Sequence, residues 1–306
     1  MYQSEFLNVI KNLGIRIRPP LINIDSKIKD SICEICLRIN QPIVIYTFDK
    51  SFFLEEDGSL SSNSRHSFII TQDDMLETLK ILCNFSIYSF QNQIKEGFIT
   101  LKGGHRVGLS GTAVINDGKI INISDISSIN IRISKEIPGC SSKIFEKFGI
   151  NLGGTLIVGP PSSGKTTILR DISRILSTSY GNNKLIKVSI VDERREIAAV
   201  YQGTPQRNVG YSDVLSGFQK SDGIMMALRT MSPKVIICDE IGNDTDVEIM
   251  KKLLNCGVDI ISSIHAKSTE EISKSVRIRN ILNSGAIKHV VLLDKGKIKS
   301  MFDFQS

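Results

Sequence analysis

The stretch that decides the fold of this chain reads Gly159-Pro160-Pro161-Ser162-Ser163-Gly164-Lys165-Thr166-Thr167. It fits the pattern G-x-x-x-x-G-K-[ST], in which a glycine-rich turn leads from a strand into a helix. Residues 155–158, Thr-Leu-Ile-Val, form the short apolar run expected of a buried strand. Residues 167–176 place their isoleucines and leucines on one helical face. The context therefore supports the pattern on both sides.

A turn of this kind binds phosphate for physical reasons. The helix that follows points unpaired backbone N–H groups at an anion, and the helix dipole adds to the attraction. Gly159 and Gly164 let the backbone approach phosphate oxygens closely. We expect Lys165 to neutralise the β- and γ-phosphates of ATP, and the Thr166 hydroxyl to ligate Mg²⁺. Residues 159–167 are thus the predicted nucleotide-binding segment.

Further apolar runs follow the loop and end in polar residues. Residues 187–191, 235–238 and 258–264 read as buried strands, and 223–229 as a helix between two of them. Residues 290–293 and 298–302 form a closing hairpin, and 268–271 form a capping box that opens a helix. Strands that alternate with helices predict an open α/β sheet that binds its ligand at the carboxyl edge.

Asp239 and Glu240 directly follow the apolar run 235–238. A phosphate-loop ATPase needs an acidic strand end beside the loop to hold Mg²⁺, and Asp239 is our candidate for that ligand. Glu240, one residue later, is placed to orient and deprotonate the attacking water. We therefore predict Thr166 and Asp239 as metal-binding residues and Glu240 as the catalytic base.

Two other strand ends carry polar residues whose roles stay open at this stage. Asp192 and Glu193 end an earlier strand, where Glu193 either assists the water or the metal, or pairs at the surface with Arg194 or Arg195. His265 follows the strand 258–264, where it either senses the γ-phosphate or is merely structural. We keep Glu193 and His265 as candidate catalytic residues.

Four arginines are candidates for stabilising charge in the transition state, namely Arg106, Arg132, Arg207 and Arg229. One arginine that reaches a γ-phosphate can be worth a factor of roughly 10³–10⁵ in rate. The alternative for any single one is a surface salt bridge. The sequence does not decide between a role in the same subunit and a role in a neighbouring one.

Residues 1–136 predict a smaller mixed α/β domain, and the break at Pro138-Gly139 separates it from an ATPase domain over 137–306. Helices are expected at 26–39, with an Asp25 N-cap, and at 71–83. Strands are expected at 42–47, 67–71, 97–101, 112–115 and 119–123, the last two joined by the turn Asn116-Asp117-Gly118. The glycine-rich stretch 102–111 indicates bends or close backbone approach, or else a bulged strand pair.

Composition agrees with a globular protein of two domains. The chain has 306 residues, 41% of them hydrophobic and 23% charged. We expect no signal peptide, because the first residues lack a basic segment followed by an apolar one, and no apolar run reaches the ~18 residues that a membrane span needs. Residues 1–136 carry 15 Lys and Arg against 15 Asp and Glu, so the net charge of +6 lies in 137–306. We interpret Cys33 and Cys36 as buried thiols, because no second pair completes a zinc site.

With these residues in hand, the chain resembles the stage III sporulation protein AA family, ATPases related to the ring-forming ATPases of type II and type IV secretion. The resemblance covers nearly the full length. It rests on the phosphate loop and on residues 34–39 with Pro42, 97–100, 103–108, 128–132, 191–194, 213–215 and 231–242. Residues 191–194 resemble the acidic box of the secretion ATPases, and 263–266 resemble their histidine box.

The resemblance implies a RecA-like core and a cytoplasmic hexamer, peripheral to membrane proteins of a channel complex between mother cell and forespore, on the mother-cell side. Hydrolysis of ATP with Mg²⁺ would power assembly or transport there. In such rings a neighbouring subunit completes the nucleotide site, which gives Arg132 and Arg106 catalytic roles. The sequence departs from the family at Cys33 and Cys36, and at Ala266-Lys267 after the histidine.

Two alternative functions remain at this stage. The basic half of the chain allows a nucleic-acid-stimulated ATPase, although the chain ends soon after its last hairpin and leaves no room for a nucleic-acid-binding module. A nucleotide-gated scaffold with negligible turnover is the other. We expect ATP hydrolysis and no nucleic-acid partner.

Overall fold

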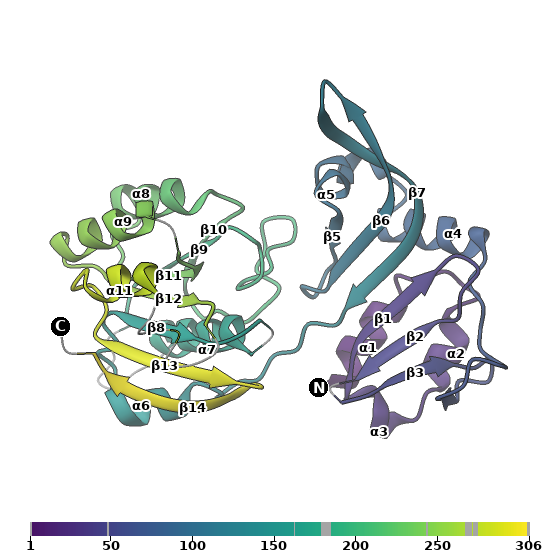
Figure 1. Ribbon diagram of the computed structural model, residues 1–306, viewed down its shortest axis with the longest axis horizontal. Coiled ribbons are helices and arrows are strands. Elements are labelled where there is room, and N and C mark those ends of the chain that lie inside the picture. The colour runs from purple at the N-terminus through teal and green to yellow at the C-terminus, as the bar shows by residue number, and fades with distance from the viewer. Residues whose placement is uncertain are drawn as a thin grey trace. The chain divides into compact units, whose positions relative to one another are not determined.

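The structure is a computed structural model that describes residues 2–47, 49–161, 163–178, 185–242, 244–266, 271 and 275–304. The chain divides into two compact units, Met1–Lys135 and Glu136–Ser306 (Figure 1). Each unit has its own sheet and its own hydrophobic core.

Unit 1 combines an antiparallel sheet with short helices. In chain order its elements are α1 (Tyr2–Ile10), α2 (Arg18–Asn23), α3 (Ser26–Lys29), β1 (Ile32–Arg38), β2 (Val44–Thr47), β3 (Ser51–Leu54), β4 (Leu60–Ser61), α4 (Gln72–Leu82), η1 (Ile87–Phe90), α5 (Gln91–Lys95), β5 (Phe98–Thr100), β6 (Arg106–Asn116) and β7 (Lys119–Arg132). The strand order is β4-β3-β2-β1-β7-β6-β5. The expected hairpin is confirmed: β6 and β7 pair from Asn116 and Lys119 onward, and Asp117 and Gly118 both have positive φ.

The two faces of this sheet differ in polarity. Residues that alternate along β1, β6 and β7 are buried against α1 and α4; they include Ile35, Leu37, Val107, Ile129 and Ile131. The residues between them face the other way, and the register places Glu34, Arg132 and Arg106 in one row across three strands. Unit 1 therefore has one apolar face that forms its core and one polar face.

The helix expected over residues 26–39 is wrong. Asp25 does act as an N-cap, since its side chain accepts from the Lys27 N–H at 2.8 Å, but the helix ends at Lys29. Residues 32–38 form β1, which lies between β2 and β7 and pairs with both. A register shift between Ile32 and Glu34 buries Ile32 and Ile35 together, so a bulged strand imitates helical spacing.

The expected helix at 71–83 and the strands at 42–47, 97–101, 112–115 and 119–123 correspond to α4, β2, β5, β6 and β7, but one expected strand is wrong. The strand expected at 67–71 is replaced by isolated bridges at Ser67 and Ile69. In the glycine-rich stretch the pairing of β6 with β7 is bulged, which is one of the two alternatives: Ser110 lies opposite Ser128 but Thr112 lies opposite Ser124, so β7 holds two extra residues there. Cys36 is buried and Cys33 half-buried, and burial raises the pKa of both thiols, that of Cys36 to about 11. Neither thiol is poised for redox chemistry.

Unit 2 is a parallel sheet with helices on both faces. Its elements are α6 (Ser142–Phe148), β8 (Thr155–Val158), α7 (Lys165–Thr178), β9 (Val188–Asp192), β10 (Asp213–Ser216), α8 (Lys220–Thr230), β11 (Val235–Glu240), α9 (Asp244–Asn255), β12 (Asp259–Ile264), α11 (Val276–Leu282), β13 (His289–Asp294) and β14 (Lys297–Asp303). The strand order is β10-β9-β11-β12-β8-β13-β14, and only β14 pairs antiparallel to its neighbour among these strands.

The strands of unit 2 alternate between two cores. Leu156 and Val158 of β8 pack with α8, α9 and α11, whereas Ile157 packs with α6 and α7. The same alternation in β11 and β12 fills both layers, which is why these strands read as continuous apolar runs. The predicted capping box at Ser268 falls partly outside the described residues; the described helix α11 has Ser275 as its N-cap.

In unit 1, Asp74 takes part in two stabilising interactions. It forms a capping box with Thr71 at the start of α4 and an ion pair with Arg16. Burial raises the pKa of Asp74, but the hydrogen bonds from Arg16 and Thr71 lower it further, to about 2. The ionised carboxylate therefore stabilises unit 1 at neutral pH.

We expect Asp74→Asn to lower the opening free energy of the α4 amides by about 1–3 kcal/mol at pH 7, because it removes the charge from a buried cap. The folded pKa lies below the unfolded value of about 4, so the contribution is present above pH ~4 and is lost as the pH falls toward ~2. Hydrogen exchange read by mass spectrometry checks both points. Asp73→Asn, an exposed change in the same turn, is the control; an equal effect of the two changes contradicts the assignment.

Candidate nucleotide-binding site

The phosphate loop links β8, which pairs with β12 and β13 inside the sheet, to the first residue of α7. Gly164 has a φ of +89°, a conformation that a side chain would strain. At Gly159 a Cβ would lie 2.4 Å from Ser163 Oγ and 2.9 Å from the Leu293 carbonyl oxygen, so only glycine fits. The Ser163 hydroxyl is buried without a hydrogen-bond partner among the described residues. Ser162 itself lies outside them.

Lys165 is buried at the start of α7, and its ammonium group closes the loop. Nζ donates to the carbonyl oxygens of Gly159 and Pro160 at 2.9 and 2.8 Å, and it lies 3.0 Å from His265 Nδ1. An ammonium group has three N–H donors, so Nδ1 accepts the third. Burial lowers the pKa of Lys165, and the charges of Glu240 and Asp239 oppose that shift.

His265 connects the loop to the acidic end of β11. Because Nδ1 accepts from Lys165, Nε2 carries the ring proton and points it at Glu240 Oε2, 3.3 Å away. Glu240 Oε2 also lies 3.2 Å from a guanidinium nitrogen of Arg194. The structure thus brings together three of the predicted residues, Lys165, His265 and Glu240.

Thr166 and Asp239, the two predicted metal ligands, also meet. The Thr166 hydroxyl donates to Asp239 Oδ1 at 3.5 Å. Burial raises the pKa of Asp239 to about 6, the nearby carboxylates of Glu196 and Asp192 add to the shift, and Arg194 opposes it. A hydroxyl and a carboxylate are hard oxygen ligands of the kind that Mg²⁺ prefers, so the residues present fit this ion.

A bulge in β11 presents the two consecutive acids. Ile237 is opposite Ile261 in β12, but Glu240 is opposite Ser263, so β11 holds one extra residue between these pairs. The Asp239 carbonyl oxygen accepts from the side-chain hydroxyl of Ser262 in β12, at 3.0 Å. In a regular strand, adjacent side chains point to opposite faces; the bulge re-aims them.

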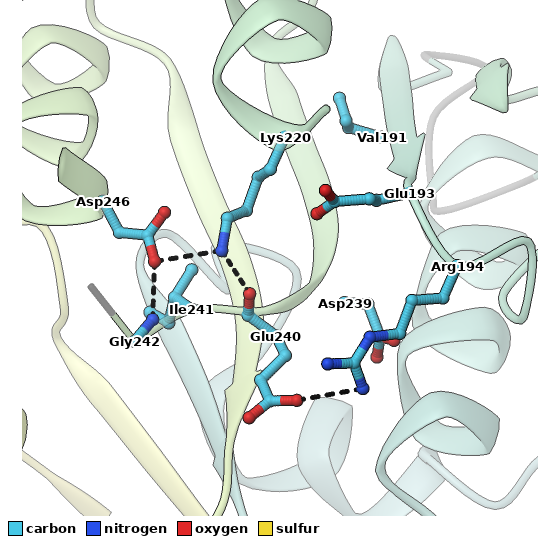
Figure 2. A pocket seen from close by; sticks show the side chains of 9 residues that line it. All are labelled: Val191, Glu193, Arg194, Lys220, Asp239, Glu240, Ile241, Gly242 and Asp246. Carbon is cyan, nitrogen blue, oxygen red and sulfur yellow. Dashed lines mark hydrogen bonds and ion pairs between the residues drawn. The ribbon is translucent and has the colours of Figure 1, made fainter. Parts of the chain in front are cut away.

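A cavity of about 180 Å³ opens at this edge of the sheet (Figure 2). It is lined by Val191, Glu193, Arg194, Lys220, Asp239, Glu240, Ile241, Gly242 and Asp246. Lys220 and Asp246 did not follow from the sequence analysis. In the sequence, Lys220 lies before the apolar stretch 223–229 and Asp246 lies in a polar stretch, and neither position matches a motif.

Asp192 and Glu193 have different environments. Asp192 is fully buried; its carboxylate accepts from the backbone N–H groups of Glu196, Ile197 and Ala198 at 2.8, 3.1 and 2.9 Å. It therefore folds the turn after β9. Glu193 is exposed and lines the cavity, and its carboxylate makes no hydrogen bond or ion pair with a described residue (Figure 2).

The candidate arginines lie in both units. Arg106 and Arg132 are cross-strand neighbours on the polar face of unit 1, where the Arg106 guanidinium stacks 4.1 Å from the centre of the Phe98 ring. Arg207 is buried within unit 2, and Arg229 is exposed in the last turn of α8.

Comparison with solved structures defines the fold class. The ATPase DotB of Legionella pneumophila aligns with 85% of this chain and 72% of its own, with a TM-score of 0.55 at 18% identity. The pilus retraction motor PilT, solved with bound ADP, aligns over 91% and 81%, with a TM-score of 0.53 at 15% identity. The chain therefore has the α/β fold of the P-loop secretion ATPases, as the sequence predicted.

The family follows from sequence. Residues 3–305 match the family described as sporulation stage III, protein AA, and the chain belongs to it. Stage III sporulation protein AA of Bacillus subtilis (strain 168) is 35% identical over 266 residues, which is 86% of this chain and 83% of that protein. The resemblance drawn from the motifs is confirmed.

We expect Asp192→Asn to lower the free energy of unfolding by about 2–3 kcal/mol, because an amide nitrogen would face a buried N–H donor. Glu193→Gln, at an exposed side chain, is the matched control and should stay within ±0.5 kcal/mol. Urea denaturation of both variants checks this. Equal stability of the two variants would refute a structural role for Asp192.

Proposed function

We propose that this protein hydrolyses ATP to ADP and phosphate with Mg²⁺, as a ring-forming motor of the secretion type. One observation carries the proposal: the phosphate loop and the acidic end of β11, which are far apart in sequence, meet through Thr166–Asp239 and through Lys165–His265–Glu240. The fold shared with DotB and PilT supports it.

The residues of the loop have the roles of a phosphate cradle. The backbone N–H groups at the start of α7 and the Lys165 ammonium bind the phosphates, and Lys165 exchanges its loop carbonyl partners for phosphate oxygens. Thr166 and Asp239 would hold Mg²⁺, which would supply positive charge to the phosphate oxygens. Burial favours this step, since a cation relieves the unfavourable charge on Asp239.

Glu240 acts on the attacking water. Its carboxylate takes a proton from the water, whose oxygen bonds to the γ-phosphorus while the bond to the bridging oxygen of ADP breaks. His265 donates its Nε2 proton toward Glu240 Oε2 and so orients that carboxylate. Glu193 is a second acid at the same cavity, where it assists the water or the metal.

Family membership supports the cellular role. We propose a cytoplasmic hexamer, peripheral to membrane proteins of the sporulation channel complex on the mother-cell side of the forespore envelope, in which hydrolysis powers assembly or transport. No helix in the described residues is long and apolar enough to cross a bilayer. Arg132 and Arg106 stabilise the transition state from a neighbouring subunit. Nucleic acid is not a proposed partner.

Lys165→Ala should abolish binding of a fluorescent ATP analogue, because the phosphates lose their only loop cation among the described residues. Glu240→Gln should keep binding within about threefold and lower kcat at least ~100-fold, since an amide cannot accept the proton. Fluorescence titration and phosphate release measure the two effects. A wild type that turns over no faster than Glu240→Gln would instead support the nucleotide-gated scaffold, and stimulation by DNA or RNA at low salt would support the nucleic-acid alternative.

Arg132→Ala and Arg106→Ala should each lower kcat, by up to about 10³-fold, with ATP binding retained. If the arginines act between subunits, mixing Arg132→Ala with Glu240→Gln should restore activity, because mixed rings contain sites with an intact acid and an intact arginine. Phosphate release from mixtures measures this, and light scattering with and without ATP measures the mass. Activity that stays at the level of the separate variants would contradict a role between subunits.

A further inference from the structure

The end of β11 is held by side chains and a backbone group of other elements. After the bulge, the Asp239 carbonyl oxygen accepts from the Ser262 hydroxyl, and the Ile241 N–H donates to the Ser263 carbonyl oxygen at 2.9 Å. The Glu240 carbonyl oxygen accepts from the Lys220 ammonium group, and the Gly242 N–H donates to Asp246 Oδ2 at 2.6 Å. Each residue around Glu240 is therefore fixed through its backbone.

Lys220 and Asp246 form one unit of this support. Lys220 Nζ lies 2.9 Å from Asp246 Oδ2, and their side chains are only 14% and 3% exposed. Lys220 is the first residue of α8, and Asp246 lies in the first turn of α9. Figure 2 shows the pair beside the Glu240 backbone, with Asp246 also reaching the Gly242 N–H.

Different residues contact the backbone of Glu240 and its carboxylate. The carboxylate contacts His265 and Arg194, whereas Lys220 contacts only the carbonyl oxygen of the same residue. A charge-assisted bond from a largely buried ammonium group is strong, and its second partner, Asp246, fixes the position of that group. Lys220 thus fixes the position of the Glu240 backbone, and the contacts of the carboxylate with His265 and Arg194 fix the direction of the side chain.

We propose that Lys220 and Asp246 form a positioning clamp that holds the Glu240 backbone so that its carboxylate meets the attacking water. The inference rests on the proposed ATPase function and adds two residues that contact the backbone of the Glu240 segment. Lys220 donates two hydrogen bonds, one to the Glu240 carbonyl oxygen and one to Asp246, and it acts on the reaction through Glu240. A misplacement of about 1 Å in such a group can cost about 10²-fold in rate.

Lys220→Met tests the clamp, because it keeps the length of the side chain and removes the charge and the donors. We expect kcat to fall about 10–100-fold, with the KM for ATP and the affinity for a fluorescent ATP analogue unchanged within about threefold. Lys220→Arg retains donors and charge and should recover most of the lost kcat. Lys251→Met, the same change at an exposed position of α9, is the control and should leave kcat unchanged.

Asp246→Ala provides a second, independent variant. It should lower kcat to a similar degree, and the double variant Lys220→Met/Asp246→Ala should be no more than about twofold slower than the slower single variant, because both changes open the same clamp. Thermal unfolding of each variant reports folding separately from turnover.

The outcomes are distinct. A Lys220→Met protein within twofold of the wild-type kcat, or one that loses ATP affinity and thermal stability in parallel with kcat, overturns the clamp and leaves the ATPase proposal intact. Full additivity of Lys220→Met and Asp246→Ala also overturns it. A wild type that binds the ATP analogue but releases no phosphate overturns the proposed function, and the clamp with it.

Discussion

The structure of the site depends on where one buried ammonium group finds its three acceptors. Lys165 donates to two carbonyl oxygens of its own loop and to His265 at the end of β12. The histidine in turn faces Glu240 at the end of β11. One charge therefore joins three neighbouring strand ends, β8, β12 and β11, and any anion that draws Lys165 out of the loop disturbs the whole chain of contacts.

Burial gives these contacts their strength. Asp239 and Lys165 both have pKa values shifted by burial toward their neutral forms, and each is partly sustained by charges of opposite sign nearby. A buried charged group is costly when no group of opposite charge compensates it. A metal-bound phosphate would fit the site electrostatically, because it brings a cation to Asp239 and an anion to Lys165. Asp192 shows the other solution: three backbone N–H groups satisfy it within the fold, so it needs no ligand.

Much of unit 2 could be predicted because local and global preferences agree there. The continuous apolar runs of β8, β11 and β12 are buried on both sides, and the loop motif specifies a strand, a turn and a helix. The same reasoning failed at residues 32–38 of unit 1. A bulge there places Ile32 and Ile35 at helical spacing, and pairing with β2 and β7 outweighs the local pattern.

The sequence alone was enough to identify the phosphate loop, the acid pair and the histidine as candidates. Each of these follows an apolar run, and such a run can be recognised as a strand from its own residues. It was not enough to find Lys220 and Asp246 or to separate Asp192 from Glu193. Lys220 and Asp246 come together because α8 and α9 approach the β11 bulge. Asp192 differs from Glu193 because the turn after β9 places three backbone N–H groups on its carboxylate. Contacts between segments distant in sequence depend on how helices pack over a sheet, and no local pattern of residues records that packing.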